Sequence, residues 1–247
     1  MNLNNLTKSK NPMLSDSSIN KVSGAITTTN GEVMTVSGAA TKTLILVSIL
    51  LCTTLYSYQN PLSIFMPIGA LGGAAVYFLT SFKPHLAPTT APIYAVLKGL
   101  FVGTISAYYA SQFGGIVFQA VSLTMATLIA MLIVYQTGLI KVTQKFRMGV
   151  SMAVGAIMIV YLISWIGNFV GFQVPFIHDS GPLGIGITVV IIGVAALNLL
   201  LDFDNFEKGE QRQSPKFMEW YYAMGLLFTL VWLYIEFLRL LGKLQRD

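Results

Sequence analysis

A few ionisable side chains of this sequence lie inside or at the ends of long apolar stretches, where their chemistry needs an explanation. They are Lys98, Asp202, Asp204, Glu236 and Arg239. Placing a charge near the centre of a lipid bilayer costs at least about 2.5–3.5 kcal/mol, so such residues normally face a bundle interior and find partners there. Ionised carboxylates that line a wet cavity are also hard oxygen ligands suited to Ca²⁺. If the stretches cross a membrane, these residues mark its functional site.

The two aspartates are two residues apart at the end of one apolar stretch. Residues i and i+2 of a helix point about 200° apart, so only one of Asp202 and Asp204 is expected to face the interior. Asn198 shares the face of Asp202 at a spacing of four residues. The alternative is that both aspartates simply close a helix at the membrane interface.

Glu236 stands in an otherwise apolar string, and its alternative role is a local pair with Arg239 at i, i+3. Two carboxyl groups that share a buried site can hold one proton between them, because two negative charges repel strongly there. That shared proton would hold two helices together, and its loss would separate them, which makes a pH-sensitive latch. Lys98 is a candidate to neutralise one acid; its alternative is to snorkel to the cytoplasmic side from an early position in its span.

Composition indicates that these residues belong to a membrane protein. Of 247 residues, 54% are hydrophobic and 10% are charged, whereas soluble domains carry about 25% charged residues. A span needs about 20 apolar residues, and β-barrel alternation is not visible. The expected fold class is therefore an all-α integral membrane protein with seven transmembrane helices. We place them at 43–58, 62–82, 91–111, 114–138, 148–172, 182–204 and 218–241.

The segments outside the spans predict the domain organisation and the orientation. Residues 1–42 are polar and lack apolar periodicity, so we expect a disordered cytoplasmic tail before a transmembrane domain at 43–247. Lys and Arg gather in the tail and in the second, fourth and sixth connections, which puts the N-terminus in the cytoplasm. A seven-span chain then ends outside, although Arg239, Lys243 and Arg246 lie at that end. A short re-entrant last segment is the alternative.

Several strings of the sequence form an ordered set over the expected spans. They are MT at 34–35, KT at 42–43, APIYAVLKGLFVGTIS at 91–106, GIVFQA at 115–120, LDFD at 201–204, EWY at 219–221 and TLVWLYIEFLRLL at 229–241. In this order the chain resembles a bacterial member of the Bax inhibitor family, the transmembrane Bax-inhibitor-motif proteins. The long polar tail is similar to that of the longer bacterial subgroup.

This resemblance implies six helices around a central C-terminal helix, and a pH-sensitive calcium leak controlled by two acids on the last two helices. Phe203-Asp204 matches the Tyr-Asp of the sixth helix, and the string ending at Glu236 matches the Leu-Tyr-x-Asp of the seventh. The implied ion- and pH-sensing residues are therefore Asp204 and Glu236, with Asp202 beside them. Asp204 and Glu236 are also the implied Ca²⁺ ligands.

The family's arginine latch on the second helix has no counterpart, because residues 62–82 contain no arginine. Lys98 is the candidate substitute, and Arg239 is a second candidate. Geometry sets a condition on the acid pair. A seventh helix that starts at Phe217 puts Glu236 about 28 Å further along. The acids then meet only if that helix begins outside the membrane or the sixth helix extends beyond it.

The leading functional hypothesis is a pH-sensitive cation leak, with Ca²⁺ as the favoured ion, in a bacterial inner membrane. The alternative is a membrane-embedded regulator or binding partner of a membrane protease or another assembly, in which the tail is the working part. A third hypothesis is a proton-coupled transporter, although no internal repeat supports it. The sequence lacks HExxH, GxSxG, Walker A and dinucleotide glycine motifs, so we expect no enzyme. The expected partners are the bilayer, Ca²⁺ and protons, with no resident cofactor and no nucleic acid.

Overall fold

The computed structural model describes residues 32–171 and 181–245, which are helical apart from turns, connections and one isolated bridge. Seven helical segments are long and apolar enough to cross a membrane. This confirms the predicted all-α fold class with seven candidate spans. The helices are α2 Val36–Gln59, α3 Phe65–Pro67, α4 Gly73–Phe82, α5 Ala87–Gln112, α6 Ile116–Gln136, α7 Gln144–Val170, α8 Pro182–Gln211 and α9 Met218–Leu244. A π-helical turn, Ile68–Gly72, joins α3 to α4, and a 3₁₀ turn, Pro84–Leu86, leads into α5.

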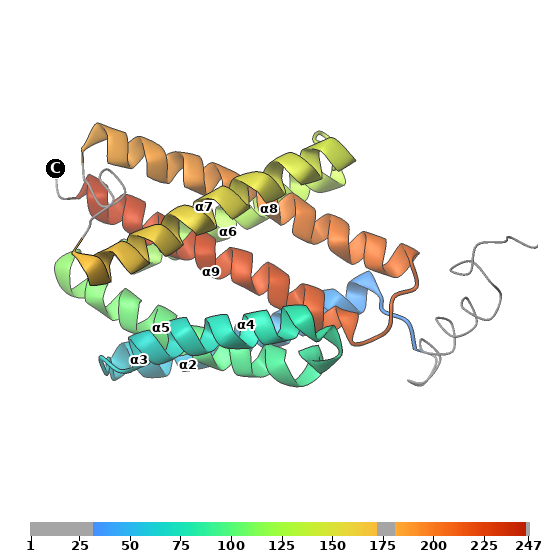
Figure 1. The fold of residues 1–247 in the computed structure, drawn as a ribbon, viewed down its shortest axis with the longest axis horizontal. Helices are drawn as coiled ribbons and strands as arrows, with labels where there is room; N and C mark the ends of the chain where they lie inside the picture. Colours follow the sequence, from blue (N-terminus) through green and yellow to red (C-terminus); the bar gives the residue numbers. More distant parts are fainter. Residues whose placement is uncertain (1–31, 172–180, 246–247) are drawn as a thin grey trace, which may run out of the picture.

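The last helix, α9, is the centre of the bundle. All six residues from Thr229 to Tyr234 are buried, and six successive residues point in every direction around a helix. Figure 1 shows α9 passing between α2–α5 on one side and α6–α8 on the other. The sequence signature of this position is a helix that is hydrophobic around most of its circumference. The arrangement agrees with six helices around a central seventh.

Small residues allow α2 and α5 to approach closely. A Cβ atom added at Gly99 or Gly103 would overlap side chains of Thr53 and Ser57 on α2. The Ser57 hydroxyl also donates a hydrogen bond to the Gly99 carbonyl oxygen at 3.1 Å. In a bilayer, where apolar burial alone does not drive association, such close backbone packing holds helices together. It positions α5 as one wall around α9.

Several helix ends differ from those predicted. The first helix begins at Val36, because the Thr35 side chain caps it by accepting the N–H of Gly38 at 2.9 Å. The predicted polar tail therefore ends before Val36 and not at residue 42, while residues 1–31 lie outside the described residues. α8 continues seven residues past the predicted end at 204. Polar helical turns beyond the membrane are invisible to a hydropathy pattern.

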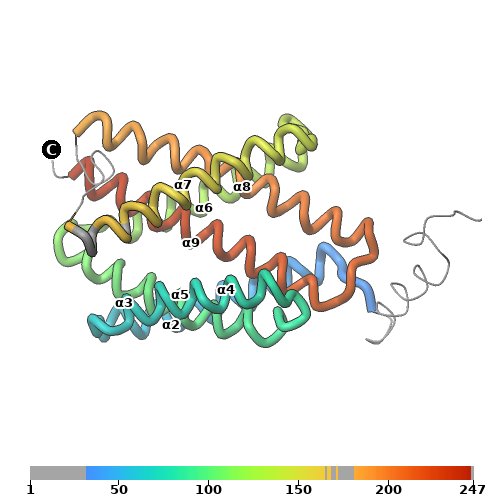
Figure 2. The backbone as a smooth tube through the Cα atoms, in the orientation of Figure 1, coloured from blue at the N-terminus to red at the C-terminus, as the bar shows by residue number. Residues whose placement is uncertain are grey.

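The last segment is one continuous helix of 27 residues. Its length exceeds the about 20 residues that cross a hydrocarbon core, so it is a candidate span. The α8–α9 connection also holds the start of the described chain, as Figure 2 shows. The Met34 amide donates to the Ser214 carbonyl at 2.8 Å, and the Lys216 amide donates to the Glu32 carbonyl at 3.2 Å.

Two carboxylates from the last two helices stabilise the start of α2. Glu219 Oε1 accepts the backbone N–H of Thr35 at 3.1 Å, and Glu210 Oε1 accepts that of Val36 at 3.1 Å. These are amide groups that no helical carbonyl can satisfy. Negative charge is favourable at this positive end of the helix dipole. The beginning of α2 is thereby tied to the helices that carry the predicted acids.

Candidate functional site

The antiparallel packing of α8 and α9 sets which residues face each other. The connection at 212–217 is short, so the two helices run side by side in opposite directions. Asp202 of α8 lies level with Thr229 of α9, whose hydroxyl donates to Asp202 Oδ2 at 2.6 Å. Asn198 Nδ2 donates to Thr229 Oγ1 at 2.9 Å and to Asp202 Oδ2 at 3.4 Å. Asn198 and Asp202 thus share a face of α8, as their i, i+4 spacing predicts.

Asp202 also faces a polar cavity of about 140 Å³. Both hydrogen bonds that it accepts use Oδ2. The cavity has room for several water molecules, since one water needs about 10–15 Å³. The Asp202 carboxylate is therefore surrounded by hydroxyl and amide groups as well as by packed hydrocarbon. The residues that line the cavity are Tyr77, Ser81, Asp202, Asn205, Tyr221, Tyr222, Met224 and Gly225.

Asp204 faces α7, on the side of α8 away from Asp202. It forms ion pairs with Arg147 and with Lys208, the latter at 2.7 Å. Arg147 also donates to Asn205 Oδ1 at 2.8 Å. Only 8% of each aspartate is exposed, because α8 packs against α9 on one face and against α7 on another. The expected 200° separation therefore leads to two different buried environments and not to one buried and one interfacial acid.

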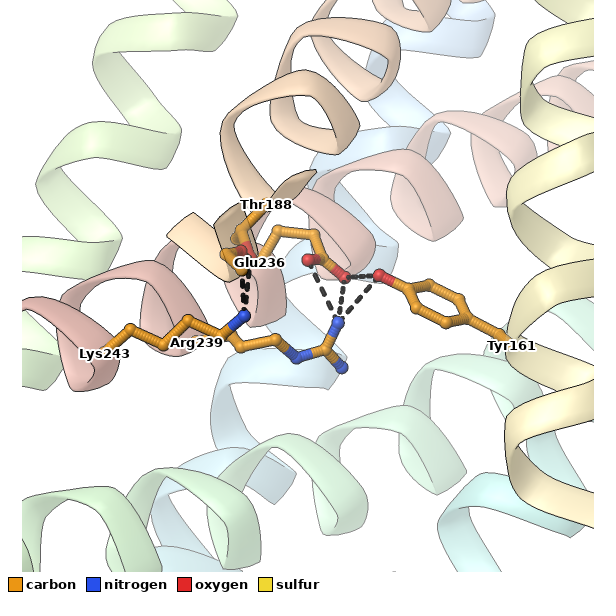
Figure 3. A network of polar contacts seen from close by, with 6 residues as sticks. Tyr161, Thr188, Glu236, Arg239 and Lys243 are labelled. Carbon is orange, nitrogen blue, oxygen red and sulfur yellow. Dashed lines mark hydrogen bonds and ion pairs between the residues drawn. The ribbon is translucent and has the colours of Figure 1, made fainter. Parts of the chain in front are cut away.

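Glu236 is held in a third environment, shown in Figure 3, with only 1% of the residue exposed. Arg239 Nη1 donates to both carboxylate oxygens, at 2.9 and 3.1 Å. The Tyr161 hydroxyl of α7 donates to Oε1 at 2.7 Å and accepts from Arg239 Nη1 at 2.7 Å. The i, i+3 pair considered from sequence is thus present, and Tyr161 links it to a neighbouring helix.

The buried Lys243 lies near the end of α9 and contacts the start of α8. Its Nζ donates to the Gly184 carbonyl at 2.9 Å and to the Thr188 hydroxyl at 3.1 Å. Figure 3 shows this contact beside the Glu236 group. Together the two groups tie α7, α8 and α9 at the end of the bundle opposite the α8–α9 connection.

The structure does not bring Asp204 and Glu236 together, which corrects the expectation of a shared Ca²⁺ site. Glu236 lies seven residues beyond Thr229, or about 10 Å along the axis, and Asp204 lies on the other side of that level. α8 does extend past its predicted end, but the register places Asp202, and not Asp204, against α9. Among the described residues, no group of three or more His, Cys, Asp or Glu side chains is placed to hold a metal ion.

Lys98 occupies a different place from the one expected. Because α5 begins at Ala87, Lys98 lies in the middle of the helix and not early in it. Its ammonium group lies 5.7 Å from the ring centre of Tyr94 and 5.5 Å from that of Phe101. These contacts are cation–π interactions. The two candidate latches therefore differ, since Arg239 holds Glu236 while Lys98 packs on aromatic rings.

Sequence reasoning missed the partners that define these environments. The span expected at 148–172 leaves Arg147 in the preceding connection, but α7 begins at Gln144 and carries Arg147 in its first turn. The sequence shows only an arginine just before an expected span. The positive-inside rule accounts for such an arginine without a carboxylate partner. Tyr161 and Thr229 gave no signal, because a hydroxyl in an apolar string is usually satisfied by its own helix.

Comparison with known proteins adds a family to this geometry. A family model described as Bax inhibitor 1 like matches residues 11–246. The match covers every described helix and all three acids. No curated protein and no solved structure matches the chain.

Proposed function

Because this chain belongs to the Bax inhibitor 1 like family, we propose that it is a pH-sensitive cation leak of a membrane, with Ca²⁺ as the favoured ion. One observation carries the proposal. Asp202, a buried acid on the interface with the central helix, faces a polar cavity with room for water. An ionised carboxylate at a hydrated cavity attracts hard cations such as Ca²⁺. The proposal includes no catalytic step and no resident cofactor.

The interface between α8 and α9 offers a route with two polar ends. Asp202 lies toward the α8–α9 connection, and Glu236 with Lys243 lies toward the opposite end. Buried apolar side chains, including Leu199 and Leu233, lie between them. In this conformation the apolar layer closes the route. Opening requires α9 to shift against its neighbours.

Protonation enters through the charge of the acids. A proton on Asp202 removes the negative charge that attracts the cation, so flux is expected to rise as pH rises. We further propose an N-terminus in the cytoplasm of a bacterial inner membrane. The Lys and Arg residues of the connections at 137–143 and 212–217 support that orientation.

The test is Ca²⁺ flux into proteoliposomes between pH 5 and 8. We compare the unmodified protein with Asp202→Asn, Asp204→Asn and Glu236→Gln. The matched control is Glu207→Gln, an exposed acid on the same helix. The proposal expects flux that rises with pH, a flattened response in Asp202→Asn and an unchanged response in the control. Flux no greater than in empty liposomes at every pH would refute the leak and favour a membrane-embedded regulator.

A further inference from the structure

A second cavity, of about 780 Å³, lies between α2 and α6, with a floor formed by α5 and α9. Its walls are almost wholly apolar and include Leu51 and Leu55 of α2 and Phe118 and Val121 of α6. Because α2 and α6 are both candidate membrane spans, a groove between them faces the hydrocarbon interior of a bilayer. It is separate from the Asp202 cavity, and the proposed leak does not use it.

The deepest polar groups of the groove are satisfied by the protein itself. The Ser106 hydroxyl donates to the Val102 carbonyl at 2.6 Å, so the Tyr234 hydroxyl, 2.6 Å away, donates to Ser106. The Thr124 hydroxyl donates to its own helix at 2.7 Å. No hydroxyl proton at this depth is left for water. An apolar occupant can therefore cover these groups without breaking a hydrogen bond.

The length of the groove corresponds to one leaflet. It extends along α2 from Val47 to Tyr58, or about 16 Å at 1.5 Å per residue. That is about half of a hydrocarbon core of about 30 Å. Tyr58 lies near the last residue of α2, Gln59, with 40% of its surface exposed. Its ring is therefore at the depth where tyrosines meet lipid headgroups.

The extent of the groove favours hydrocarbon chains over a helix. A transmembrane helix of a partner or of a second copy would cross both leaflets. The residues that line this groove extend over only about 16 Å of α2, which corresponds to one leaflet. The acyl chains of a lipid occupy one leaflet and adapt to irregular apolar walls.

We propose that this groove binds the acyl chains of one membrane lipid, with the headgroup at the Tyr58 end. The bound chains would lie against Leu230, Val231 and Tyr234 of α9. These residues adjoin Thr229, the hydroxyl donor to Asp202. The lipid would thus pack directly on α9, the helix that carries Thr229 and Glu236.

The test uses a phosphatidylethanolamine that carries a photoreactive diazirine on one acyl chain, present at low mole fraction in proteoliposomes of the full-length protein. After illumination, labelled peptides are mapped by mass spectrometry. Labelling is expected to concentrate on 47–58 and 115–125, several-fold above the exposed lipid-facing residues of α7. Labelling that follows exposure alone, with α7 and the groove equal, would overturn the proposal as ordinary lipid contact. Cross-links between two copies through α2 and α6 would also overturn it, because a second chain would then occupy the site.

Filling the groove supplies the matched comparison. Val121→Trp enlarges a lining residue that is 42% exposed, whereas Ile159→Trp enlarges an α7 residue that is 59% exposed. Val121→Trp should lower labelling of 47–58 at least threefold and leave labelling of α7 unchanged, which also shows that the variant is folded. Leu55→Trp should act in the same way from the opposite wall. Ile159→Trp should leave groove labelling intact, and equal effects of the groove and α7 variants would contradict specific binding.

Discussion

The ion pair between Glu236 and Arg239 can be tested by removing its two charges separately and together. Glu236 is almost fully buried, whereas 25% of the Arg239 side chain is exposed. Their oxygen and nitrogen atoms are 2.9 and 3.1 Å apart, with the Tyr161 hydroxyl bonded to both residues. The variants are Glu236→Gln, Arg239→Met and the double substitution.

The expected costs are unequal. Removing one partner of a buried pair costs about 3–5 kcal/mol, because the other charge stays buried without compensation. Arg239→Met leaves the fully buried carboxylate unpaired, so it should reach the upper part of that range. Glu236→Gln leaves a guanidinium that can partly reach solvent, so it should fall at the lower end. Removing both charges is often close to neutral. The double variant should therefore be at least about 2 kcal/mol more stable than the sum of the single effects predicts.

The measurement is reversible unfolding of each variant by SDS titration in mixed micelles, followed by circular dichroism. Arg212→Met is the control, since it removes an equal charge from an exposed position and should change the free energy of unfolding by about 0.5 kcal/mol or less. Additive effects of the two single substitutions would refute the reasoning. An Arg239→Met cost equal to that of the control would do the same.

Two further substitutions test the contacts around α9 by the same unfolding measurement. Gly38→Ala places a methyl group against the buried Glu219 carboxylate and should lower the free energy of unfolding by about 1–3 kcal/mol. Its control is Gly149→Ala, where the added methyl group meets open space and should raise the free energy of unfolding by about 0.5–1 kcal/mol. Equal effects of the two substitutions would count against close packing at Gly38. Thr229→Val removes the hydroxyl that donates to Asp202 and should cost about 1.5–3 kcal/mol if that carboxylate is charged. A cost below about 0.5 kcal/mol would show that the hydrogen bond contributes nothing.

The spans were predictable from sequence because about 20 apolar residues leave few alternatives to a membrane helix. The central position of α9 was implied by the family resemblance, and its burial on every side agrees. Asn198 and Asp202 could be paired because they belong to one helix. Spacing within a helix is determined by local geometry alone.

The acid partners were not predictable, because they depend on how one helix is placed along another. A change of one residue in register moves α9 by about 1.5 Å and turns it by about 100°. The sequence therefore did not show that Asp202 would meet Thr229, or that Asp204 would meet Arg147. The start of α5 at Ala87, before the expected start at 91, places Lys98 in the middle of its helix and not early in it.

Asp202 and Glu236 lie at levels about 10 Å apart along the axis of α9. This separation argues against a latch in which the two carboxyl groups share one proton. At about 10 Å and an effective dielectric constant of about 20, two unit charges interact by about 2 kcal/mol, compared with about 4 kcal/mol at 4 Å. Arg239 neutralises much of the Glu236 charge and reduces this further. Substitutions of Asp202 and of Glu236 should therefore affect the flux independently of each other. In flux measurements the double variant Asp202→Asn with Glu236→Gln should change the pH profile by the product of the single effects. A double variant no different from either single one would mean that the acids act as a unit, and that α9 must move by about 10 Å relative to α8 to unite them.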